Sequence, residues 1–187
     1  MASSFQLYQE LGLRGEVNFP AFEQALKGFS RYASGQDRLL VLIDYTKPST
    51  EKRFYILDLL QKKLLLSTYV AHGRGSGDNY AVAFSNRPGS YQSSLGFFRT
   101  GDTYMGKNGY SLFLDGLEKG INDKARERAI VVHGANYADP AVLKGQQRLG
   151  RSLGCPALPP DISKQVIDTI KGCLLYTSPS PRDMRRS

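Results

Sequence analysis

The sequence predicts a β-rich domain, of the mainly β or α+β class, with one helix before the strands and one after them. The 187-residue chain holds 19 glycines and 11 tyrosines, a composition typical of strands joined by tight turns. Short apolar runs recur from Asp37 onward, and helical periodicity is confined to one segment near each end. A chain of this length with 41% apolar residues can bury the core of one domain.

The first helix is expected over Phe19–Tyr32. Phe22, Leu26 and Phe29 share one face of it, and Pro20 suits a first turn because its missing N–H has no intrahelical acceptor there. Three short runs then follow, RLLVLIDY, KRFYILDL and KLLLSTYVA, and they predict consecutive strands of a meander. We therefore expect an N-terminal helical segment over residues 1–36, packed on a β-rich domain over residues 37–173.

The middle of the chain has glycines every few residues between short strand-like pieces. This pattern, over Ala71–Gly120, is typical of loops draped over a sheet or of a barrel with tight corners. The run RAIVVHG then predicts a buried strand that ends in His133, and a polar loop follows over Ala135–Arg151.

The second helix is expected within PDISKQVIDTIKG, with Gly172 as its stop. Its apolar face holds Ile162, Val166, Ile167 and Ile170. The last segment, residues 174–187, is rich in Ser, Pro and Arg and has no periodicity, so we expect a disordered tail without function. The tail also resembles read-through of cloning or sequencing-adapter sequence, which would make it non-native.

The net charge of +8 is dispersed along the chain, which favours a solvated surface over a nucleic-acid interface. No run approaches the roughly 18 apolar residues of a membrane span, so none is expected. The N-terminal residues lack a basic and an apolar stretch, so no signal peptide is visible. Either the protein is cytoplasmic or a targeting segment is missing from this sequence.

The chain has only two cysteines, Cys155 and Cys173, and two histidines, His72 and His133. This inventory excludes a Cys-rich zinc site, and we expect neither a metal nor a cofactor. A disulfide between the two cysteines stays open, although two cysteines alone give it little support.

The segment HGRGSG, from His72 to Gly77, superficially resembles a phosphate-binding loop. It lacks the Lys and Ser or Thr that must follow, because Asp78 and Asn79 come next. We expect a turn beside a binding cleft, with Arg74 as a contact for an anionic group, or a purely structural turn.

Cys155 and His133 have the residue types of a nucleophile and its base. A histidine within hydrogen-bond reach converts a thiol to the reactive thiolate, and a Gly/Pro loop exposes amides that can bind an oxyanion. We therefore expect the amides of Gly154 and Cys155 to form an oxyanion hole, with Ser152 orienting one partner or the substrate. From residue types alone, a buried structural cysteine and histidine remain the alternative.

Two segments, VVHGANYAD and GRSLGCPALP, resemble the signature of the bacterial L,D-transpeptidases, which is His-Gly, a spacer, then Ser/Thr-His-Gly-Cys. The separated motifs YVAHGRGSG and VLIDYTKPSTEKRFYILDL resemble the murein L,D-transpeptidase catalytic domain branch, and the likeness extends from Gln6 to Cys173. The resemblance implies a sandwich-like or barrel-like fold, Cys155 as nucleophile and His133 as general base. It also implies an orienting partner for His133, either the Gly134 carbonyl or a neighbour within HGAN.

Two positions depart from the family pattern. Leu153 stands where the signature has its second histidine, and Ala157 where many relatives have Arg or Asn. These changes bear on how the substrate is held, and the candidate replacements are Arg151, Tyr137, Arg74 and Tyr104. Ser152, which matches the hydroxyl of the signature, is also expected to hold the substrate.

The resemblance implies acyl transfer on peptidoglycan stem peptides by a monomeric protein that works outside the cytoplasm, in the periplasm or cell wall. Two alternatives stay open. One is a cysteine peptidase or amidase acting on the same polymer, which the His-before-Cys order disfavours. The other is a non-catalytic peptidoglycan-binding protein on a degenerate fold, which Leu153 and Ala157 motivate.

Overall fold

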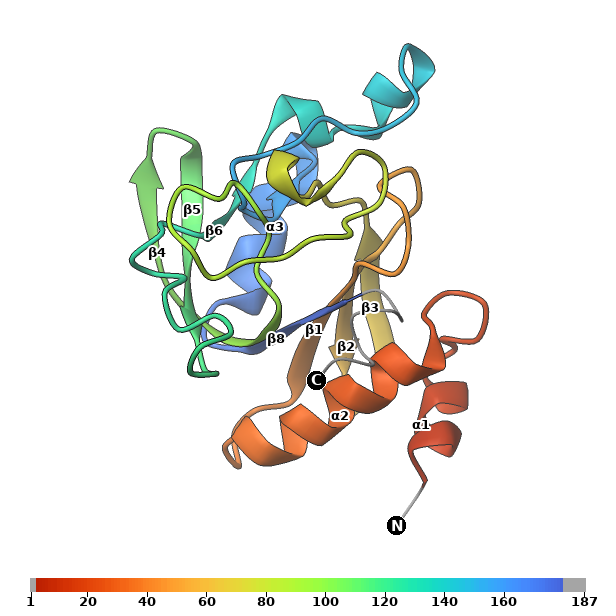
Figure 1. The fold of residues 1–187 in the computed structure, drawn as a ribbon. Helices are drawn as coiled ribbons and strands as arrows, with labels where there is room; N and C mark the ends of the chain where they lie inside the picture. Colours follow the sequence, from red (N-terminus) through yellow and green to blue (C-terminus); the bar gives the residue numbers. More distant parts are fainter. Residues whose placement is uncertain (1–2, 180–187) are drawn as a thin grey trace.

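The computed structural model describes residues 3–179, and within them eight strands form one mixed sheet in the order β3-β2-β1-β8-β4-β5-β6-β7 (Figure 1). The strands are β1 Leu39–Asp44, β2 Phe54–Asp58, β3 Lys63–Thr68, β4 Gly96–Gly106, β5 Gly109–Gly116, β6 Val131–Gly134, β7 Ala157–Leu158 and β8 Leu174–Ser178. The helices are α1 Ser4–Glu10, α2 Phe19–Tyr32 and α3 Pro160–Ile170, with short 3-10 turns η1 Arg74–Ser76, η2 Asn136–Ala138 and η3 Pro140–Lys144. None of the helices in residues 3–179 has the length and apolarity to cross a membrane.

The sheet curves around α3, which lies between the β1–β3 half and the β4–β6 half (Figure 1). Alternate residues of β1 point to opposite faces. Val41 and Ile43 join the core against α3, whereas Leu40 and Leu42 join a second core against α1 and α2. The β-rich class and the two flanking helices predicted from the sequence are confirmed, and the barrel-like alternative describes the curved sheet.

Helix α2 begins and ends at the residues that its periodicity predicts. Pro20 lies in its first turn, and Phe22 and Ala25 are fully buried against the sheet. Helix α1 was not predicted, because seven residues are too few to show a helical period. Its start is marked by Ser3, whose hydroxyl accepts a hydrogen bond from the Gln6 amide at 3.1 Å.

The predicted meander is confirmed, since β1, β2 and β3 pair antiparallel in chain order. The expectation of a disordered tail from residue 174 is wrong for Leu174–Ser178. These residues form β8, which pairs parallel with β1 and antiparallel with β4 and is buried along its whole length. The apolar Leu-Leu-Tyr run fits a strand covered on both faces. Residues 180–187, the rest of the predicted tail, lie outside the described residues.

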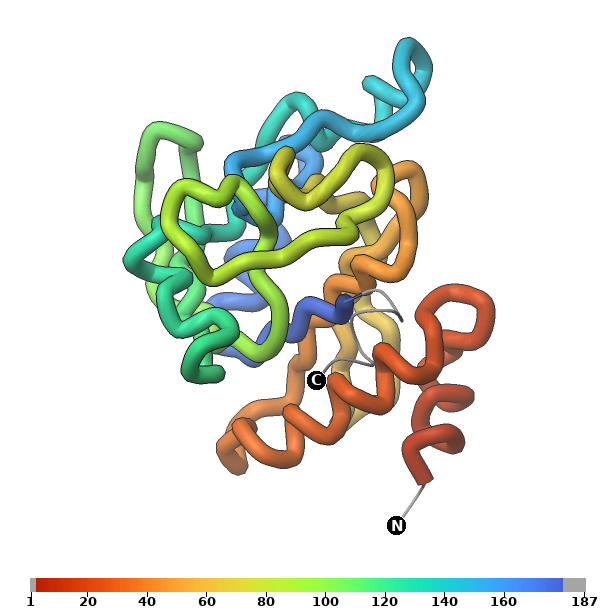
Figure 2. The backbone as a smooth tube through the Cα atoms, in the orientation of Figure 1, coloured from red at the N-terminus to blue at the C-terminus, as the bar shows by residue number. Residues whose placement is uncertain are grey.

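The long segment between β3 and β4, drawn yellow to green in Figure 2, crosses the face of the molecule near the chain that precedes α3. Gly73 forms an isolated bridge with Ser152, and Ala71 forms one with Ala157. Two loops far apart in the sequence are thereby fixed beside each other at the end of the sheet where β6 and β7 pair.

Candidate active site

Cys155 and His133 line one cleft of about 350 Å³. His133 lies in β6, one residue before the strand ends, and Cys155 lies two residues before β7. Strands β6 and β7 pair parallel with His133 opposite Ala157, so the sheet register brings the two candidate residues to the same edge. The sequence could only suggest that Cys155 and His133 lie together, and in the structure they line the same cleft.

The His133 ring is held in one orientation. Its Nδ1 lies 2.9 Å from the Gly134 carbonyl oxygen, which can only accept a hydrogen bond, so Nδ1 carries the proton in the neutral ring. Burial lowers the pKa of His133, opposed by that same hydrogen bond. A neutral imidazole with its lone pair on Nε2 has the form that a general base requires.

The Cys155 thiol is buried and contacts backbone on one side. Its Sγ donates to the Ala129 carbonyl at 3.4 Å and accepts from the Val131 amide at 3.4 Å. Burial raises the pKa of Cys155, while the Val131 amide and the charges of Arg128 and Lys107 lower it. Because burial dominates, the resting residue is a thiol that needs a base to become a nucleophile.

Ser152 shapes the turn that carries the cysteine. Its hydroxyl donates to the Cys155 carbonyl at 2.6 Å and accepts from the Gly154 amide at 3.1 Å. The Gly154 amide, expected in the oxyanion hole, is therefore already used within the turn. The Cys155 amide has no acceptor among residues 3–179, so it is the amide of this predicted pair that is available to an oxyanion.

The HGRGSG segment forms η1 and supports the cysteine turn. The His72 carbonyl accepts from the Ser152 amide at 2.9 Å, and the Arg74 amide donates to the Ser152 carbonyl at 2.8 Å. A Cβ on Gly73 would come within 2.8 Å of the Gly154 Cα, so the two loops approach too closely for any side chain there. Of the two roles that the sequence left open for this segment, these contacts fit the structural one, a turn that supports the loop of Cys155 beside the cleft.

Three of the five residues predicted to hold the substrate line the cleft: Ser152, Arg151 and Tyr137. The other two do not. The guanidinium of Arg74 lies over the Tyr91 ring at 4.4 Å from its centroid, and Tyr104 stacks on Phe113 with 4.3 Å between ring centroids. No motif in the sequence marks either contact: Arg74 meets Tyr91 across a long loop, and Tyr104 meets Phe113 across the β4–β5 hairpin.

The two departures from the family pattern have different consequences. Leu153 lines the cleft and exposes 53% of its surface, so an apolar side chain forms part of the wall where the signature has histidine. Ala157 is fully buried in β7 and packs with Ala71 and Ala138. A side chain at position 157 points into this small cluster and cannot reach the cleft.

Sequence reasoning missed three polar residues that line the cleft: Lys107, Asn108 and Arg128. The first two form the tip of the β4–β5 hairpin, between the paired residues Gly106 and Gly109. Arg128 precedes β6 in the chain. No motif marks any of them, and only the three-dimensional fold brings them to Cys155.

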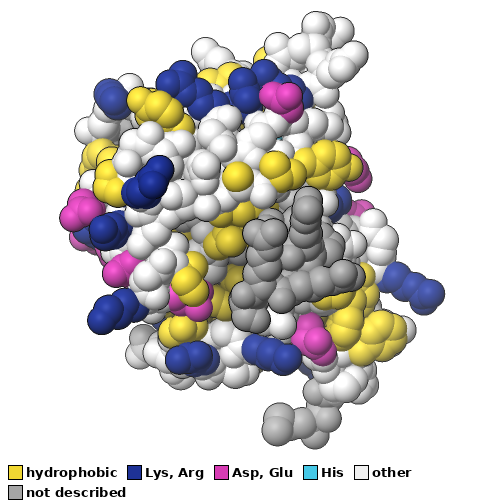
Figure 3. Space-filling model, in the orientation of Figure 1, with side chains coloured by type: hydrophobic (Ala, Val, Ile, Leu, Met, Phe, Trp, Pro, Cys, Tyr) yellow, Lys and Arg dark blue, Asp and Glu magenta, His cyan; other side chains and the backbone are white. Residues whose placement is uncertain are grey.

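The cleft is cationic. Lys107, Arg128 and Arg151 contribute to its lining, and no Asp or Glu is among its described lining residues. Figure 3 shows Lys and Arg side chains gathered over the upper part of one face, where Figure 1 places η2, η3 and the chain that leads to α3. An anionic substrate is favoured at such a surface.

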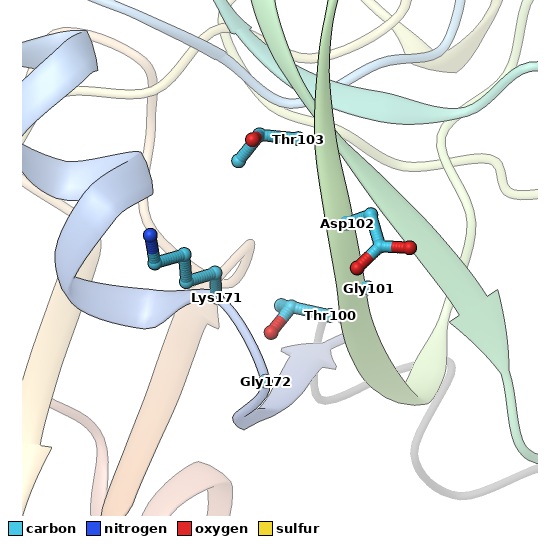
Figure 4. A pocket seen from close by; sticks show the side chains of 6 residues that line it. All are labelled: Thr100, Gly101, Asp102, Thr103, Lys171 and Gly172. Atoms are coloured by element: carbon cyan, nitrogen blue, oxygen red, sulfur yellow. The ribbon is translucent and has the colours of Figure 1, made fainter.

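A larger, more open hollow of about 750 Å³ lies beside the β4 bulge (Figure 4). Thr100, Asp102 and Thr103 line one side of it and Lys171 the other. It contains no cysteine or histidine, so it lacks the groups that acyl transfer requires.

Cys155 and Cys173 are both free thiols in the structure, and the disulfide is not formed.

A family model described as L,D-transpeptidase catalytic domain matches residues 13–177. The search of curated proteins finds no match. Among solved structures, the helical cell shape determining protein Pgp2 from Campylobacter jejuni matches with a TM-score of 0.51 and 16% identity, over 95% of this chain and 57% of that one.

Two further structures are similar to this chain. An L,D-transpeptidase from Mycobacterium smegmatis has a TM-score of 0.45 and 14% identity, over 75% of this chain and 58% of that one. The transpeptidase LdtMt1 in complex with imipenem has a TM-score of 0.45 and 14% identity, over 76% and 59%. This chain spans less than two thirds of the length of each of these three proteins. From the family match over most of its length, the chain belongs to the L,D-transpeptidase catalytic domain family.

Proposed function

We propose that the protein is a peptidoglycan L,D-transpeptidase in which Cys155 is the nucleophile and His133 the general base. The observation that carries the proposal is the shared cleft that His133 lines with the buried thiol of Cys155. His133 is neutral there, and its Nε2 has no hydrogen-bond partner among residues 3–179. Family membership supplies the reaction class.

In the first step, His133 Nε2 takes the proton of the Cys155 thiol as Sγ attacks the amide that joins the third residue of a stem tetrapeptide to its terminal D-Ala. The C–N bond breaks, the protonated His133 gives its proton to the leaving amine, and D-Ala departs. The acyl group remains on Sγ as a thioester. The Cys155 amide stabilises the oxyanion of the tetrahedral intermediate.

In the second step, an amine of a neighbouring stem attacks the thioester, with His133 again accepting the proton. Water in place of the amine gives L,D-carboxypeptidase activity instead. The cationic lining suits stem peptides, which carry carboxylates. Because this polymer lies outside the cytoplasmic membrane, we place the working protein there as well, in the periplasm or cell wall.

The test is acylation by a carbapenem, followed by intact-mass spectrometry. Thiolate attack opens the β-lactam ring without a leaving group, so the expected product is wild-type protein heavier by the whole carbapenem. The Cys155→Ala variant should remain unmodified, and the Cys173→Ser variant should react like the wild type. A wild-type protein that stays unmodified under conditions that label a known L,D-transpeptidase contradicts the proposal.

Muropeptide products separate the alternatives. Release of D-Ala together with new cross-links indicates transpeptidation, whereas hydrolysis with no amine transfer indicates a peptidase. Binding to sacculi with no change in the muropeptides indicates a non-catalytic protein.

A further inference from the structure

Arg128 is a cationic side chain of the active-site cleft that neither the family motif nor the proposed reaction uses. Its guanidinium is fixed by four hydrogen bonds to the loop between β3 and β4. Nη1 donates to the Ser85 carbonyl at 2.7 Å and to Ser94 Oγ at 3.0 Å. Nη2 donates to the Gln92 carbonyl at 2.8 Å and to Ser90 Oγ at 3.1 Å.

All four acceptors are neutral. Among residues 3–179, no carboxylate forms an ion pair with Arg128, although its neighbour Arg126 pairs with Asp115. Burial lowers the pKa of Arg128, yet a guanidinium keeps its proton in proteins. The side chain therefore holds a full positive charge that no nearby anion neutralises.

This charge lies beside the nucleophile. Arg128 and Cys155 line the same cleft, and a Cβ placed on Gly154 would be 3.6 Å from Arg128 Nη2. The residues that follow, Ala129 and Val131, supply the carbonyl and the amide that contact Sγ. The segment 128–131 thus lies along one side of the thiol, with Arg128 at its start.

The hydrogen-bond count indicates how the charge acts. A guanidinium has five N–H donors, and the loop uses four of them. Only Nε–H is left, so Arg128 cannot grip a substrate carboxylate with two parallel hydrogen bonds. Its charge therefore acts at a distance, and the sulfur of Cys155, which lines the same cleft, becomes anionic during the reaction.

We propose that Arg128 is a positioning residue whose fixed positive charge stabilises the thiolate of Cys155. The proposal deepens the proposed function, because the thiolate is the species that attacks the stem peptide.

The other groups near Cys155 do not replace this charge. Arg151 lines the same cleft, but Asp78 pairs with it at 3.2 Å. Lys107, at the exposed hairpin tip, lowers the pKa of Cys155 less than Arg128 does, and His133 is neutral because burial lowers its pKa. Burial raises the pKa of Tyr45 and raises that of Tyr137 to about 12, so both phenols stay uncharged near neutral pH.

The experiment measures the rate of iodoacetamide alkylation against pH in the intact protein, with peptide mass spectrometry reading Cys155 and Cys173 separately. In Arg128→Gln and Arg128→Met, the midpoint for Cys155 should move to higher pH, and its rate at pH 7 should fall about three- to tenfold. Arg128→Lys keeps the charge and should restore most of the rate. The Cys173 profile should not move in any variant.

Arg126→Gln is the matched control, since it removes a charge from the same segment where Asp115 already neutralises it. Two charge-removing variants, Arg128→Gln and Arg128→Met, are used so that the proposal can still be tested if one of them fails to fold. An unmoved Cys155 midpoint in the folded Gln or Met variant overturns the proposal. A shift as large in Arg128→Lys also overturns it, because the guanidinium contacts rather than the charge would then be responsible. Alkylation needs no peptidoglycan, so these outcomes are independent of whether the carbapenem test succeeds.

Discussion

Gly154 is the residue at which the turn that carries Cys155 depends most directly on the absence of a side chain. Its φ of +126° lies in a region that L-residues rarely adopt. A Cβ there would meet the Gln92 carbonyl oxygen and the Ile130 Cδ1, each at 3.0 Å. The conformation and the close packing together require glycine immediately before Cys155.

Gly154→Ala should lower the free energy of unfolding by about 1–3 kcal/mol, because the strained backbone must be accommodated or must relax. Relaxation of the backbone displaces the Cys155 amide, so the rate of carbapenem acylation should also fall. Urea denaturation and the acylation rate measure the two effects.

Gly145→Ala is the control for this substitution. Gly145 directly follows η3 with φ of −116°, and a Cβ there has no neighbour within 4 Å. This variant should stay within about 0.5 kcal/mol of the wild type. An equal loss of stability in both variants contradicts the role given to the Gly154 conformation.

At the scale of elements, helix α3 packs closely against the end of β6. A Cβ on Gly134 would lie 2.4 Å from Ser163 Oγ and 2.8 Å from Ser163 Cβ, while its next contact, Pro160 Cα, is at an ordinary 3.5 Å. The Gly134 carbonyl is also the acceptor for His133 Nδ1. The residue that orients the imidazole is therefore also the residue that α3 approaches most closely at this end of β6.

Gly134→Ala should push α3 away from β6, tilt the carbonyl and reduce acylation by at least tenfold. Adding Ser163→Gly removes both close contacts and should restore a substantial part of the rate, whereas Ser163→Gly alone should have little effect on it. A double-mutant cycle of carbapenem acylation rates measures the coupling. Strictly additive effects would show that the contact does not control His133.

At the scale of the whole molecule, the buried Arg53 side chain joins the sheet to the loops beside the Cys155 cleft. Arg53 is fully buried. Its Nη2 donates to the Val70 carbonyl at 2.7 Å and to His72 Nδ1 at 2.8 Å. His72 Nε2 donates to the Gly77 carbonyl at 3.1 Å, so the ring is neutral and both of its nitrogens have a hydrogen-bond partner. Burial first, and then the charge of Arg53, lower the pKa of His72 to about 4.

This shift predicts a loss of stability in mild acid. An unfolded histidine titrates near pH 6.5, so between about pH 6.5 and 4 the unfolded state binds more protons than the folded state. The free energy of unfolding should therefore fall as the pH falls through that range, with His72 contributing up to about 3 kcal/mol.

In His72→Gln the difference in stability between pH 7 and pH 4.5, measured by urea denaturation, should be smaller by roughly this amount. A variant with the same pH dependence as the wild type would assign the acid sensitivity to other groups.

The sequence predicted those parts of the fold that local periodicity determines. Helix α2 and the β1–β3 meander were placed correctly for this reason. Strand β8 was missed because its five residues lead into a Ser/Pro/Arg-rich stretch and gain their stability from β1 and β4, which are distant in sequence. Helix α1 was too short to show a period.

In the candidate site, too, the sequence predicts what a local motif marks and misses what long-range contacts bring together. Cys155 and His133 could be proposed because a motif marks them. Arg128 could not, since only tertiary packing brings it to the thiol, and Arg74 was expected in the cleft although it stacks on Tyr91 instead. Residues that act through long-range contacts leave no pattern in the sequence.

The proposed mechanism requires that Cys155 carries the acyl group during turnover. It is tested most directly by mixing the protein with a stem tetrapeptide, quenching in acid and mapping the modified peptide by mass spectrometry. We expect the tripeptidyl group on Cys155, D-Ala released in equal amount, and neither product with Cys155→Ala. Release of D-Ala without an acyl group on Cys155, or its continued release by Cys155→Ala, would contradict the account.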